Sequence, residues 1–506
     1  MDPTLALGLT EVSLSSSQPY TLAPEAHVPI GASQLVDPSF PSFAIQVSSF
    51  PAYSGNASHP NTFSINLVRA IEERTGGPLV IRVGGTNGDF SNFNPAQTSP
   101  IEPPMQGSGV QQKFVLGPDF YEGFGNFPDT RWVYDIPFAN QNHTDSLDQG
   151  RAAVDQIGFQ NLDALEIGNE IDHYIGQGMR PAGWGPQNYT VEFLDYAEFL
   201  TDALNLPAWP IFQTMALSSA RVPPWTAQAV FEDGITQGNR VKSVSLHHYE
   251  YTNTTTTLQE TLMNHTFVTS GVDNAFLSDF EYMKTNFPEI QIVLGEVGRF
   301  RDGGGSLDQS EGIFGSALWT ADYLLYTMSL NVTRVNMQLS MAFGYAAWHP
   351  VAYDDLEPAV IAPYYGHLLV ADFMNGSSNF RVSEIQSNDD LLAAYAGYEY
   401  DHLKRIAIMN YEVWNTGDGE RPTRKIYLKV PDGIRSVRIS TLTSPGGASA
   451  TSDFYWAGQT WTYANDGVGQ AVHQRYTEAL VWDGHVLVTV GASEAFIRAI
   501  EIAVTD

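Results

Sequence analysis

Two short segments decide how this chain is expected to fold: Leu165-Glu166-Ile167-Gly168-Asn169-Glu170 and Ile292-Val293-Leu294-Gly295-Glu296. Each is an apolar run that ends at a glutamate. Apolar runs of this length, bounded by glycine and polar residues, are typical of buried strands. A glutamate has little packing reason to end a buried strand, but in a parallel α/β barrel that end carries the active site. Two such glutamates indicate a carboxylate pair, the apparatus of glycoside hydrolysis.

The same alternation of short apolar runs and amphipathic stretches extends from about residue 43 to residue 375. Alternating strands and helices predict a parallel sheet, and eight repeats predict an α/β fold of the (β/α)8 TIM barrel type. Residues 93–128, rich in Pro, Gly and Phe, show no clear helix. The predicted strands are Phe43–Val47, Leu79–Val83, Trp132–Ile136, Ala164–Ile167, Ile211–Ala216, Val241–Leu246, Ile292–Leu294 and Arg334–Leu339. The predicted helices are Thr62–Arg74, Asp145–Gln156, Thr190–Leu204, Trp225–Asp233, Asn274–Asn286, Ser310–Leu330 and Tyr364–Met374.

After about residue 376 the pattern changes to a period of two residues. Turn signals such as Asn-Thr-Gly-Asp-Gly separate the segments, which predicts an antiparallel β-sandwich. Leu5–Ser15 also alternates and is expected to add a strand to that sandwich. We therefore predict N-terminal strands in residues 1–35, the catalytic barrel in 36–375 and a C-terminal β-sandwich in 376–506. The predicted sandwich strands are Leu391–Gly397, Arg405–Val413, Arg424–Val430, Ser436–Thr441, Val486–Val490 and Ala495–Ala503.

The charge and composition of the chain exclude several classes of partner. Its 506 residues carry a formal net charge of -31, and so acidic a surface repels nucleic acid and long sulfated glycans. The absence of cysteine excludes disulfides, thiolate metal sites and cysteine nucleophiles. No stretch approaches 18 apolar residues, so no membrane span is expected. The sequence does not decide the oligomeric state, although a monomer is favoured.

Seven Asn-x-Ser/Thr sequons, together with the acidic charge, favour a secreted eukaryotic glycoprotein. The N-terminus, Met-Asp-Pro-Thr-Leu-Ala-Leu, has neither a basic region nor a long apolar core. It is therefore not expected to act as a signal peptide as it stands. The sequons lie at Asn56, Asn142, Asn188, Asn253, Asn264, Asn331 and Asn375.

The residues around the two glutamates resemble those of clan A glycoside hydrolases. Asn169-Glu170 ends the fourth predicted strand, and Glu296 ends the seventh. The resemblance implies that Glu170 is the acid/base, that Asn169 binds the sugar 2-hydroxyl and that Glu296 is the nucleophile. A retaining enzyme needs one protonated and one ionised carboxyl group about 5–5.5 Å apart.

Three further segments resemble glycoside hydrolase family 79, the family of β-glucuronidases and heparanase. They are Ile81-Arg82-Val83-Gly84-Gly85-Thr86 with the following Asp89-Phe90, His247-His248-Tyr249, and Gly303-Gly304-Gly305. The resemblance covers the barrel and extends into the C-terminal β-domain. It implies a secreted fungal exo-acting retaining β-glucuronidase that needs no cofactor. The substrate would be a glycan or glycoside with terminal β-linked glucuronic acid or 4-O-methylglucuronic acid.

A glucuronide pocket must also bind the sugar carboxylate and hydroxyls. Arg301 stands near the position where the family more often has a tyrosine, and a guanidinium can bind a carboxylate bidentately. Pairing of Arg301 with Asp302 or Glu311 is an equally good reading. The predicted substrate-binding residues are Gln46, Thr86, Asn87, Asn169, His247, Tyr249, Arg299, Arg301, Gly344, Tyr345 and Trp348.

Each neighbour of the glutamates also has a structural interpretation. Arg82 fits best as a buried partner of a carboxylate, and Tyr249 is placed to donate to Glu296 and keep it ionised. His247 and His248 are consecutive on a strand, so only one of them can face the barrel mouth.

Other residues in this region have side chains that could act as an acid/base or as metal ligands. Glu166 lies in the same run as Glu170 and is its main rival, but it lacks a preceding Asn. Asp172 and His173 are metal-ligand types, yet no third ligand lies at metal-site spacing, so no metal is predicted.

Three other functions remain open at this point. Endo-acting cleavage of glycosaminoglycans, as in heparanase, is disfavoured by the negative charge. A β-glycosidase of neutral-sugar specificity is left open by Arg301. A non-catalytic glycan-binding protein is hard to reconcile with the presence of both glutamates and Asn169.

Overall fold

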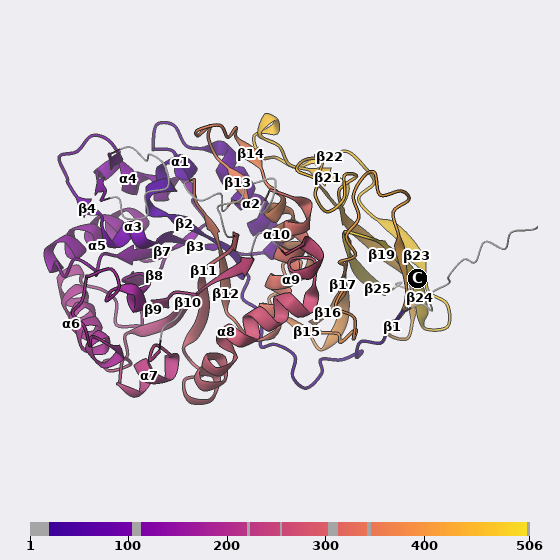
Figure 1. Cartoon of the computed structure of the whole chain (residues 1–506), viewed down its shortest axis with the longest axis horizontal. Helices are drawn as coiled ribbons and strands as arrows, with labels where there is room; N and C mark the ends of the chain where they lie inside the picture. The colour runs from indigo at the N-terminus through magenta and orange to yellow at the C-terminus, as the bar shows by residue number, and fades with distance from the viewer. Residues whose placement is uncertain are drawn as a thin grey trace, which may run out of the picture.

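The structure is a computed structural model in which an α/β barrel and a β-domain lie side by side (Figure 1). It describes residues 20–103, 113–219, 223–252, 256–301, 312–341 and 346–502, without the side chains of residues 251–252, 300–301 and 498–502. Among these residues no helix is long and apolar enough to span a membrane.

Eight parallel strands close into a barrel, as the eight apolar runs predict. Because helices cover the outside and side chains fill the inside, the strands are buried on both faces. The TIM barrel prediction is therefore confirmed. The strands are β2 (Pro41–Gln46), β3 (Val80–Gly84), β7 (Arg131–Ile136), β8 (Leu162–Ile167), β9 (Phe212–Leu217), β10 (Val241–Thr252), β11 (Gln291–Arg301) and β12 (Arg334–Leu339).

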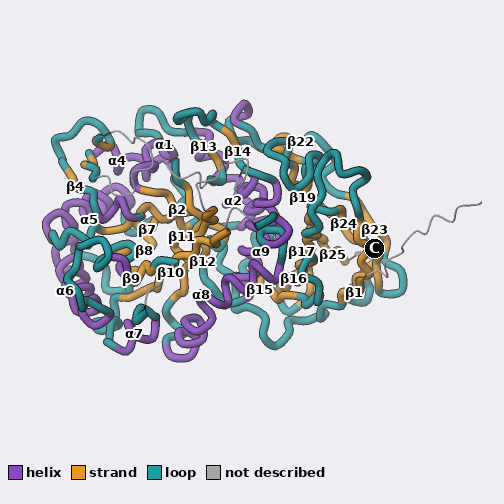
Figure 2. The backbone as a smooth tube through the Cα atoms, in the orientation of Figure 1, coloured by secondary structure: helices purple, strands orange, loops and turns teal. Residues whose placement is uncertain are grey.

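Helices surround this barrel, and the predicted ones are all present with shifted ends. They are α2 (Thr62–Thr75), α5 (His143–Ile157), α6 (Pro186–Leu204), α7 (Ala227–Glu232), α8 (His265–Asn286), α9 (Phe314–Ser329) and α10 (Ala362–Met374). The α9 and α10 helices are buried nearly all round. Figure 2 shows the reason for α9, which lies between the barrel strands and the β-domain.

Short elements occupy the segment in which the sequence predicts no clear helix. A small sheet forms from β4 (Asn92–Phe93), β5 (Ile101–Glu102) and β6 (Val115–Leu116), and the short helix α4 (Pro118–Glu122) follows it. Two more short helices, α1 (Phe50–Ser54) and α3 (Thr86–Asp89), follow β2 and β3 on the carboxyl side of those strands.

The C-terminal part is a sandwich of two sheets, as the period-two segments predict. One sheet has the order β1-β18-β24, with β1 parallel to β18. The other has the order β15-β16-β17-β25-β19-β20-β21-β22, with β23 paired to β19. The strands are β1 (Tyr20–Leu22), β15 (Phe380–Glu384), β16 (Leu392–Glu399), β17 (His402–Asn410), β18 (Thr423–Lys429), β19 (Ile434–Thr443), β20 (Tyr455–Trp456), β21 (Gln459–Thr460), β22 (Gln470–Ala471), β23 (Thr477–Leu480), β24 (His485–Gly491) and β25 (Glu494–Ile502).

The predicted strand Leu5–Ser15 lies outside the described residues, while β1 joins the smaller sheet from the N-terminal side. We keep the division at residues 35/36 and 375/376 as a proposal. It is supported by the separate apolar core between the two sheets, which includes Leu22, Ile426 and Ile408.

A buried charge cluster joins the barrel to the β-domain. His265, the first residue of α8, has its Nδ1 2.9 Å from Asp322 of α9 and its Nε2 3.1 Å from Glu384 of β15. Tyr395 of β16 donates to the other Asp322 oxygen at 2.5 Å. Burial opposes a charged imidazole here, but the two carboxylates outweigh it and raise the pKa of His265 to about 10.

We expect this cluster to stabilise the fold in a pH-dependent way. A group whose pKa is raised on folding contributes fully below its unfolded pKa of about 6.5, and the contribution is lost as pH rises towards 10. His265→Gln should therefore lower the melting temperature most near pH 6, by an amount that reflects about 3 kcal/mol. The deficit should shrink by pH 10.

Thermal unfolding monitored by circular dichroism at both pH values tests this prediction. His27→Gln is the matched control, because His27 pairs with Asp401 on the exposed surface. A deficit that is constant with pH would contradict the role of the charged imidazole.

Candidate active site

The two predicted catalytic glutamates lie at the carboxyl end of the barrel. Glu170 follows β8 and adopts the left-handed backbone conformation, with φ 46° and ψ 50°. Its N–H donates to the carbonyl of Ala216 on β9 at 2.8 Å, and Met215 and Ala216 also have positive φ angles. Such conformations are unfavourable for residues other than glycine and tend to be kept where a side chain must be aimed.

A β-bulge aims Glu296 into the barrel. Leu246 of β10 pairs with Leu294 of β11, but the next residue, His247, pairs with Glu296, so Gly295 is the extra residue. A side chain at Gly295 would place its Cβ 2.1 Å from Ser245 Oγ. Without the bulge, alternation along β11 would turn Glu296 away from the interior.

The bulge brings Glu296 close to Glu170. One carboxylate oxygen from each glutamate and one ring nitrogen of His247 all lie within 4.8 Å of one another. Retaining glycosidases hold their two carboxyl groups about 5–5.5 Å apart, whereas inverting enzymes need about 6.5–9.5 Å to admit a water molecule. The spacing therefore fits a double displacement.

The Arg82 guanidinium on β3 binds three residues at the base of the site. It donates to Glu166 Oε1 at 2.6 Å, to Glu296 Oε1 at 2.5 Å and to Asn169 Oδ1 at 2.8 Å. Its side chain is 1% exposed. Arg82 thus acts as a buried partner of carboxylates, as the sequence indicates.

Glu166, the rival of Glu170, faces this guanidinium and not the mouth. It is fully buried, and Gln213 of β9 donates to its second oxygen at 2.5 Å. Both oxygens of Glu166 are therefore engaged inside the barrel, which removes it as an acid/base candidate.

Glu296 is held on both oxygens. Arg82 binds Oε1, and the Tyr249 hydroxyl donates to Oε2 at 2.7 Å. Gly85 (φ +97°) lies beside it, and a Cβ at this glycine would be 3.3 Å from Glu296 Oε1. A carboxylate with two such donors is oriented as a nucleophile must be.

Glu170 has different neighbours, two imidazoles. His247 Nδ1 lies 3.3 Å from Oε1, and His173 Nδ1 lies 3.5 Å from Oε2. Burial raises the pKa of Glu170, but these two hydrogen bonds outweigh it and lower the pKa to about 2. Asn169 is fixed next to it, because its N–H donates to Asp89 at 3.1 Å and its Nδ2 to Thr86 at 3.4 Å.

Glu170, His247 and Glu296 are the only described residues whose ligand-type atoms cluster closely enough to suggest a metal. Arg82 and Tyr249 already occupy the oxygens of Glu296, so the donor set fits a carboxylate pair better than a cation site. Asp172 and His173 have side chains of the kinds that bind metals, but they are not part of that cluster.

Comparisons with known proteins agree with this geometry. The sequence profile described as "Glycosyl hydrolase family 79 C-terminal beta domain" matches residues 394–497. A β-glucuronidase of Aspergillus niger is 30% identical over 466 residues, which cover 87% of this chain and 85% of that protein. A β-glucuronidase of Neurospora crassa is 28% identical and covers 85% of each chain.

The chain belongs to glycoside hydrolase family 79. Solved structures support the fold. A 4-O-α-L-rhamnosyl-β-D-glucuronidase from Fusarium oxysporum matches with a TM-score of 0.79 at 18% identity, over 95% of this chain and all of that chain. A family 51 α-L-arabinofuranosidase from Bifidobacterium longum matches with a TM-score of 0.64 at 14% identity, over 96% and 100% of the two chains.

Two residues that were predicted to bind substrate in this family 79 enzyme, Arg299 and Trp348, lie outside the site. On β10, His247 and Tyr249 face the barrel interior. His248 and Glu250 face outward to α9, where they form hydrogen bonds with Tyr323 and Trp319. Arg299 is 4% exposed and pairs in register with Glu250 on that outer side. Its charge acts against the burial that raises the pKa of Glu250 to about 8. The prediction for Arg299 is corrected, because alternation after the bulge turns it outward.

Trp348 is the second correction. It is 1% exposed, its Nε1 donates to Ser64 Oγ at 2.9 Å, and its ring packs against Phe43 and Tyr53. These contacts make it part of the core between barrel and helix, so it is not a wall of the substrate pocket.

Three other predicted residues remain near the mouth. Gln46 at the end of β2 accepts from Ser340 at 2.6 Å, and Asn87 donates to Ser48 at 3.1 Å. Thr86 contacts Asn169 as described above. Gly344 and Tyr345 lie outside the described residues, and the structure describes the backbone but not the side chain of Arg301.

Sequence reasoning missed the role of Asp89, a buried residue of α3. It accepts from the backbone N–H groups of Phe138 and Asn169 at 3.0 and 3.1 Å and from the Tyr174 hydroxyl at 2.6 Å. Burial raises its pKa to about 6. The signal was its place in the Gly-Gly-Thr segment, where a short polar side chain can cap nearby backbone.

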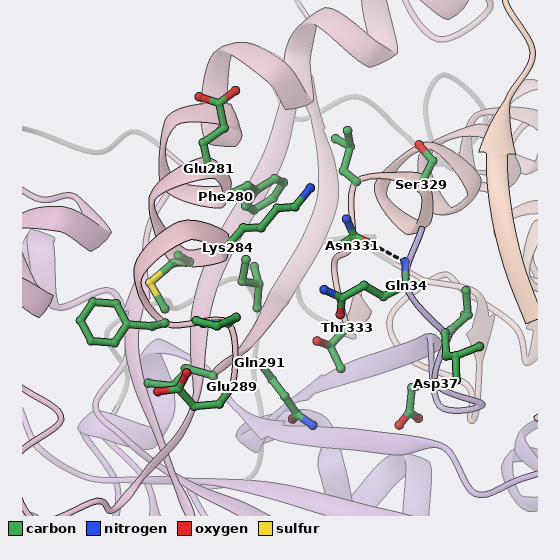
Figure 3. A pocket seen from close by; sticks show the side chains of 18 of the residues that line it. Gln34, Asp37, Phe280, Glu281, Lys284, Glu289, Gln291, Ser329, Asn331 and Thr333 are labelled. Carbon is green, nitrogen blue, oxygen red and sulfur yellow. Dashed lines mark hydrogen bonds between the residues drawn. The ribbon is translucent and has the colours of Figure 1, made fainter. Parts of the chain in front are cut away.

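A cavity of about 570 Å³ lies at the opposite, amino-terminal end of the barrel strands (Figure 3). It is lined by the end of α8 with Lys284, by Gln291 and Thr333 at the starts of β11 and β12, and by the segment with Gln34. Within this lining the N–H of Gln34 donates to Asn331 Oδ1 at 2.5 Å. It takes no part in the catalytic site.

We expect Tyr249→Phe to lower kcat by about 10- to 100-fold, since a hydrogen bond to a charged group contributes about 1.5–3 kcal/mol. The fold should remain intact, because the Tyr249 ring stays in place. Steady-state kinetics on an aryl β-glycoside substrate measure the effect.

Tyr364→Phe is the matched control, since the Tyr364 hydroxyl donates to Leu67 O at 2.9 Å on the outer helices. That variant should keep its kcat. Equal kinetics for Tyr249→Phe and the wild type would argue against the contact with the nucleophile.

Proposed function

We propose that this protein is a retaining exo-β-glucuronidase in which Glu296 is the nucleophile and Glu170 the acid/base. The observation that carries the proposal is the carboxylate pair, with oxygens within 4.8 Å, at the carboxyl end of the barrel. Glu296 attacks C1 of the sugar while Glu170 protonates the departing oxygen. Water then hydrolyses the glycosyl-enzyme, with Glu170 as base.

The different surroundings of the two glutamates support these roles. Glu296 is bound on both carboxylate oxygens by Arg82 and Tyr249, which hold it in the one orientation that a nucleophile needs. Glu170 contacts two imidazoles, which can take and return a proton. We also propose that Asn169, between Arg82 and Thr86, binds the sugar 2-hydroxyl.

Glucuronic acid is the proposed sugar, as the free acid or the 4-O-methyl ether. The support is that two relatives over most of the chain are named β-glucuronidases. We propose Arg301 and the segment with Gly344 and Tyr345 as ligands of the sugar carboxylate, and Gln46, Thr86 and Asn87 as ligands of its hydroxyls.

Exo action on terminal residues fits the charge of the molecule better than endo action on glycosaminoglycans. At a net charge of -31, the surface repels a long sulfated chain, whereas a single terminal uronate needs only one local cation. We further propose that neither nucleic acid nor a membrane is a partner, and that the protein acts as a monomer.

We propose that the protein is a secreted fungal glycoprotein. Asn142, Asn188 and Asn375 are exposed and are the better candidates for glycosylation. Asn56, Asn264 and Asn331 are partly buried, and Asn253 lies outside the described residues. A fungal origin of this protein is supported by its two relatives, which both come from fungi.

We expect Glu296→Ala and Glu170→Ala to lower kcat on a 4-nitrophenyl β-glucuronide by more than about 100-fold. Azide separates the two roles, because a small anion can replace a missing carboxylate. Glu296→Ala with azide should yield the α-glucuronosyl azide, and Glu170→Ala should yield the β-anomer. Glu281→Gln, on the exposed side of α8, is the control and should keep full activity.

A panel of 4-nitrophenyl β-glucuronide, its 4-O-methyl ether, β-glucoside and β-xyloside tests the sugar. Release of glucuronic acid from the first two supports the proposal. If only the neutral glycosides are hydrolysed, the protein is a β-glucosidase or a β-xylosidase and the proposed β-glucuronidase function is wrong. Binding without any turnover would indicate a glycan-binding protein, and oligosaccharide products from a polymer would indicate endo action.

A further inference from the structure

Asp172 and His173 follow the acid/base, and the steps above assign no role to Asp172 or to the ring orientation of His173. They form a chain of hydrogen bonds that returns to Glu170 through Ser218, the residue after β9. The Ser218 hydroxyl donates to Asp172 Oδ2 at 2.6 Å, and the Ser218 N–H donates to Asp172 Oδ1 at 3.0 Å. His173 Nε2 lies 2.9 Å from Ser218 Oγ, and His173 Nδ1 lies 3.5 Å from Glu170 Oε2.

This chain decides which nitrogen of His173 carries the proton. Asp172 is an acceptor in two hydrogen bonds, so the single hydroxyl proton of Ser218 points to it. Ser218 Oγ can then only accept from His173, and Nε2 must be the donor. A neutral imidazole has one N–H, which leaves the Nδ1 lone pair facing Glu170.

A lone pair and a carboxylate repel each other, so their contact at 3.5 Å is favourable when a proton lies between them. Either a protonated Glu170 donates to Nδ1, or a charged His173 donates to Oε2. The pair therefore holds one proton in common, and the Asp172–Ser218 unit keeps the ring in the orientation that allows the transfer. His173 has the access to solvent that replacement of this proton requires, since its side chain is 36% exposed.

We propose that His173 is a positioning residue that stores the catalytic proton for Glu170, held in its tautomer and orientation by Ser218 and Asp172. The inference rests on the proposed acid/base role of Glu170.

In the first step the proton passes from His173 Nδ1 to Glu170 Oε2, and Glu170 gives a proton to the glycosidic oxygen. The bond from C1 to that oxygen breaks as the bond from Glu296 to C1 forms. In the second step water gives its proton to Glu170, and a proton returns to His173. The bond from water to C1 forms as the bond to Glu296 breaks, so all groups are restored.

The charges around the pair favour storage on the imidazole. The hydrogen bond with Glu170 raises the pKa of His173, while Glu170 stays ionised between its two imidazoles. The other charged groups that face the pair are Asp172 behind His173, His247 on Oε1 of Glu170, and Glu296 beyond His247 at 3.9 Å. Arg82 binds Glu296 and Asn169, which lie next to the pair.

The active form carries the shared proton. Activity should therefore persist to a pH above the ordinary imidazole range of about 6.5 and fall as His173 loses its proton. Without His173 the proton resides on Glu170, which still accepts a hydrogen bond from His247 and ionises at lower pH. The alkaline limb of the pH profile should then move to lower pH.

The test is His173→Gln, which keeps a polar group beside Ser218 but cannot titrate. Leaving groups of different acidity separate proton supply from structure. On phenyl β-glucuronide, which needs protonation, kcat should fall by about 10- to 100-fold. On 2,4-dinitrophenyl β-glucuronide, whose leaving group needs little protonation, it should fall by less than about threefold. KM should change little on either substrate.

Ser218→Ala is the second variant, because it removes the acceptor that fixes the tautomer while His173 stays. It should show the same dependence on the leaving group with a smaller loss. His143→Gln is the matched control, since His143 pairs with Asp195 at 2.9 Å on helices outside the barrel. It should leave both substrates and the pH profile unchanged.

Equal losses on both substrates, or an unchanged alkaline limb in His173→Gln, would overturn the inference. If the wild type hydrolysed another aryl glycoside in place of glucuronides, the proposed sugar would be wrong, and the same two leaving groups on that glycoside would still test His173. If Glu170→Ala retained full turnover, the proposed acid/base would fail first and His173 with it.

Discussion

The site depends on one buried guanidinium. Arg82 binds Glu166 on β8, Asn169 just after β8 and Glu296 on β11, and it is almost completely excluded from solvent. The barrel interior around it also holds the buried carboxyl groups of Asp89 and Asp135, and burial and mutual repulsion raise the pKa of Asp135 well above its usual range. Because a raised pKa favours the uncharged form of Asp135, this carboxyl group does not require a second cation beside it. Removal of Arg82 would leave carboxylates uncompensated in a low-dielectric interior, which is far more costly than the loss of a surface ion pair.

With Glu296 tied to this cation, the two glutamates differ by environment alone. Glu296 accepts hydrogen bonds from a guanidinium and a phenol, which hold it in one orientation. Glu170 contacts the imidazoles of His247 and His173, which can exchange a proton with it. Two identical side chains can therefore serve opposite chemical roles, because the barrel supplies them with different neighbours. The strained backbone at Glu170 and the bulge at Gly295 aim both of them at one point.

The fold and the pair could be predicted from the sequence because both follow from simple periodicity. Eight apolar runs mark eight strands, and the carboxyl ends of parallel strands meet at one face.

Which way a side chain points is harder to predict. The bulge at Gly295 shifts the register by one residue, which places Glu296 inside and Arg299 outside. Trp348 lies in the core, since an aromatic residue after a barrel strand can pack on either side. The Asp172–Ser218–His173 chain joins segments about 45 residues apart, and no local pattern reveals such a contact.

The architecture also separates the chemistry from the choice of sugar. The proposed catalytic groups are held by hydrogen bonds among β3, β10, β11 and the residues that follow β8. Of the residues proposed to bind the uronate, Arg301 is the last residue of β11, and Gly344 and Tyr345 follow β12 in the sequence. The barrel is shared, at 14% identity, with an enzyme named for arabinofuranoside cleavage. A fold kept at so low an identity does not by itself set the substrate, so we expect the choice of sugar to lie in the segments that follow the strands.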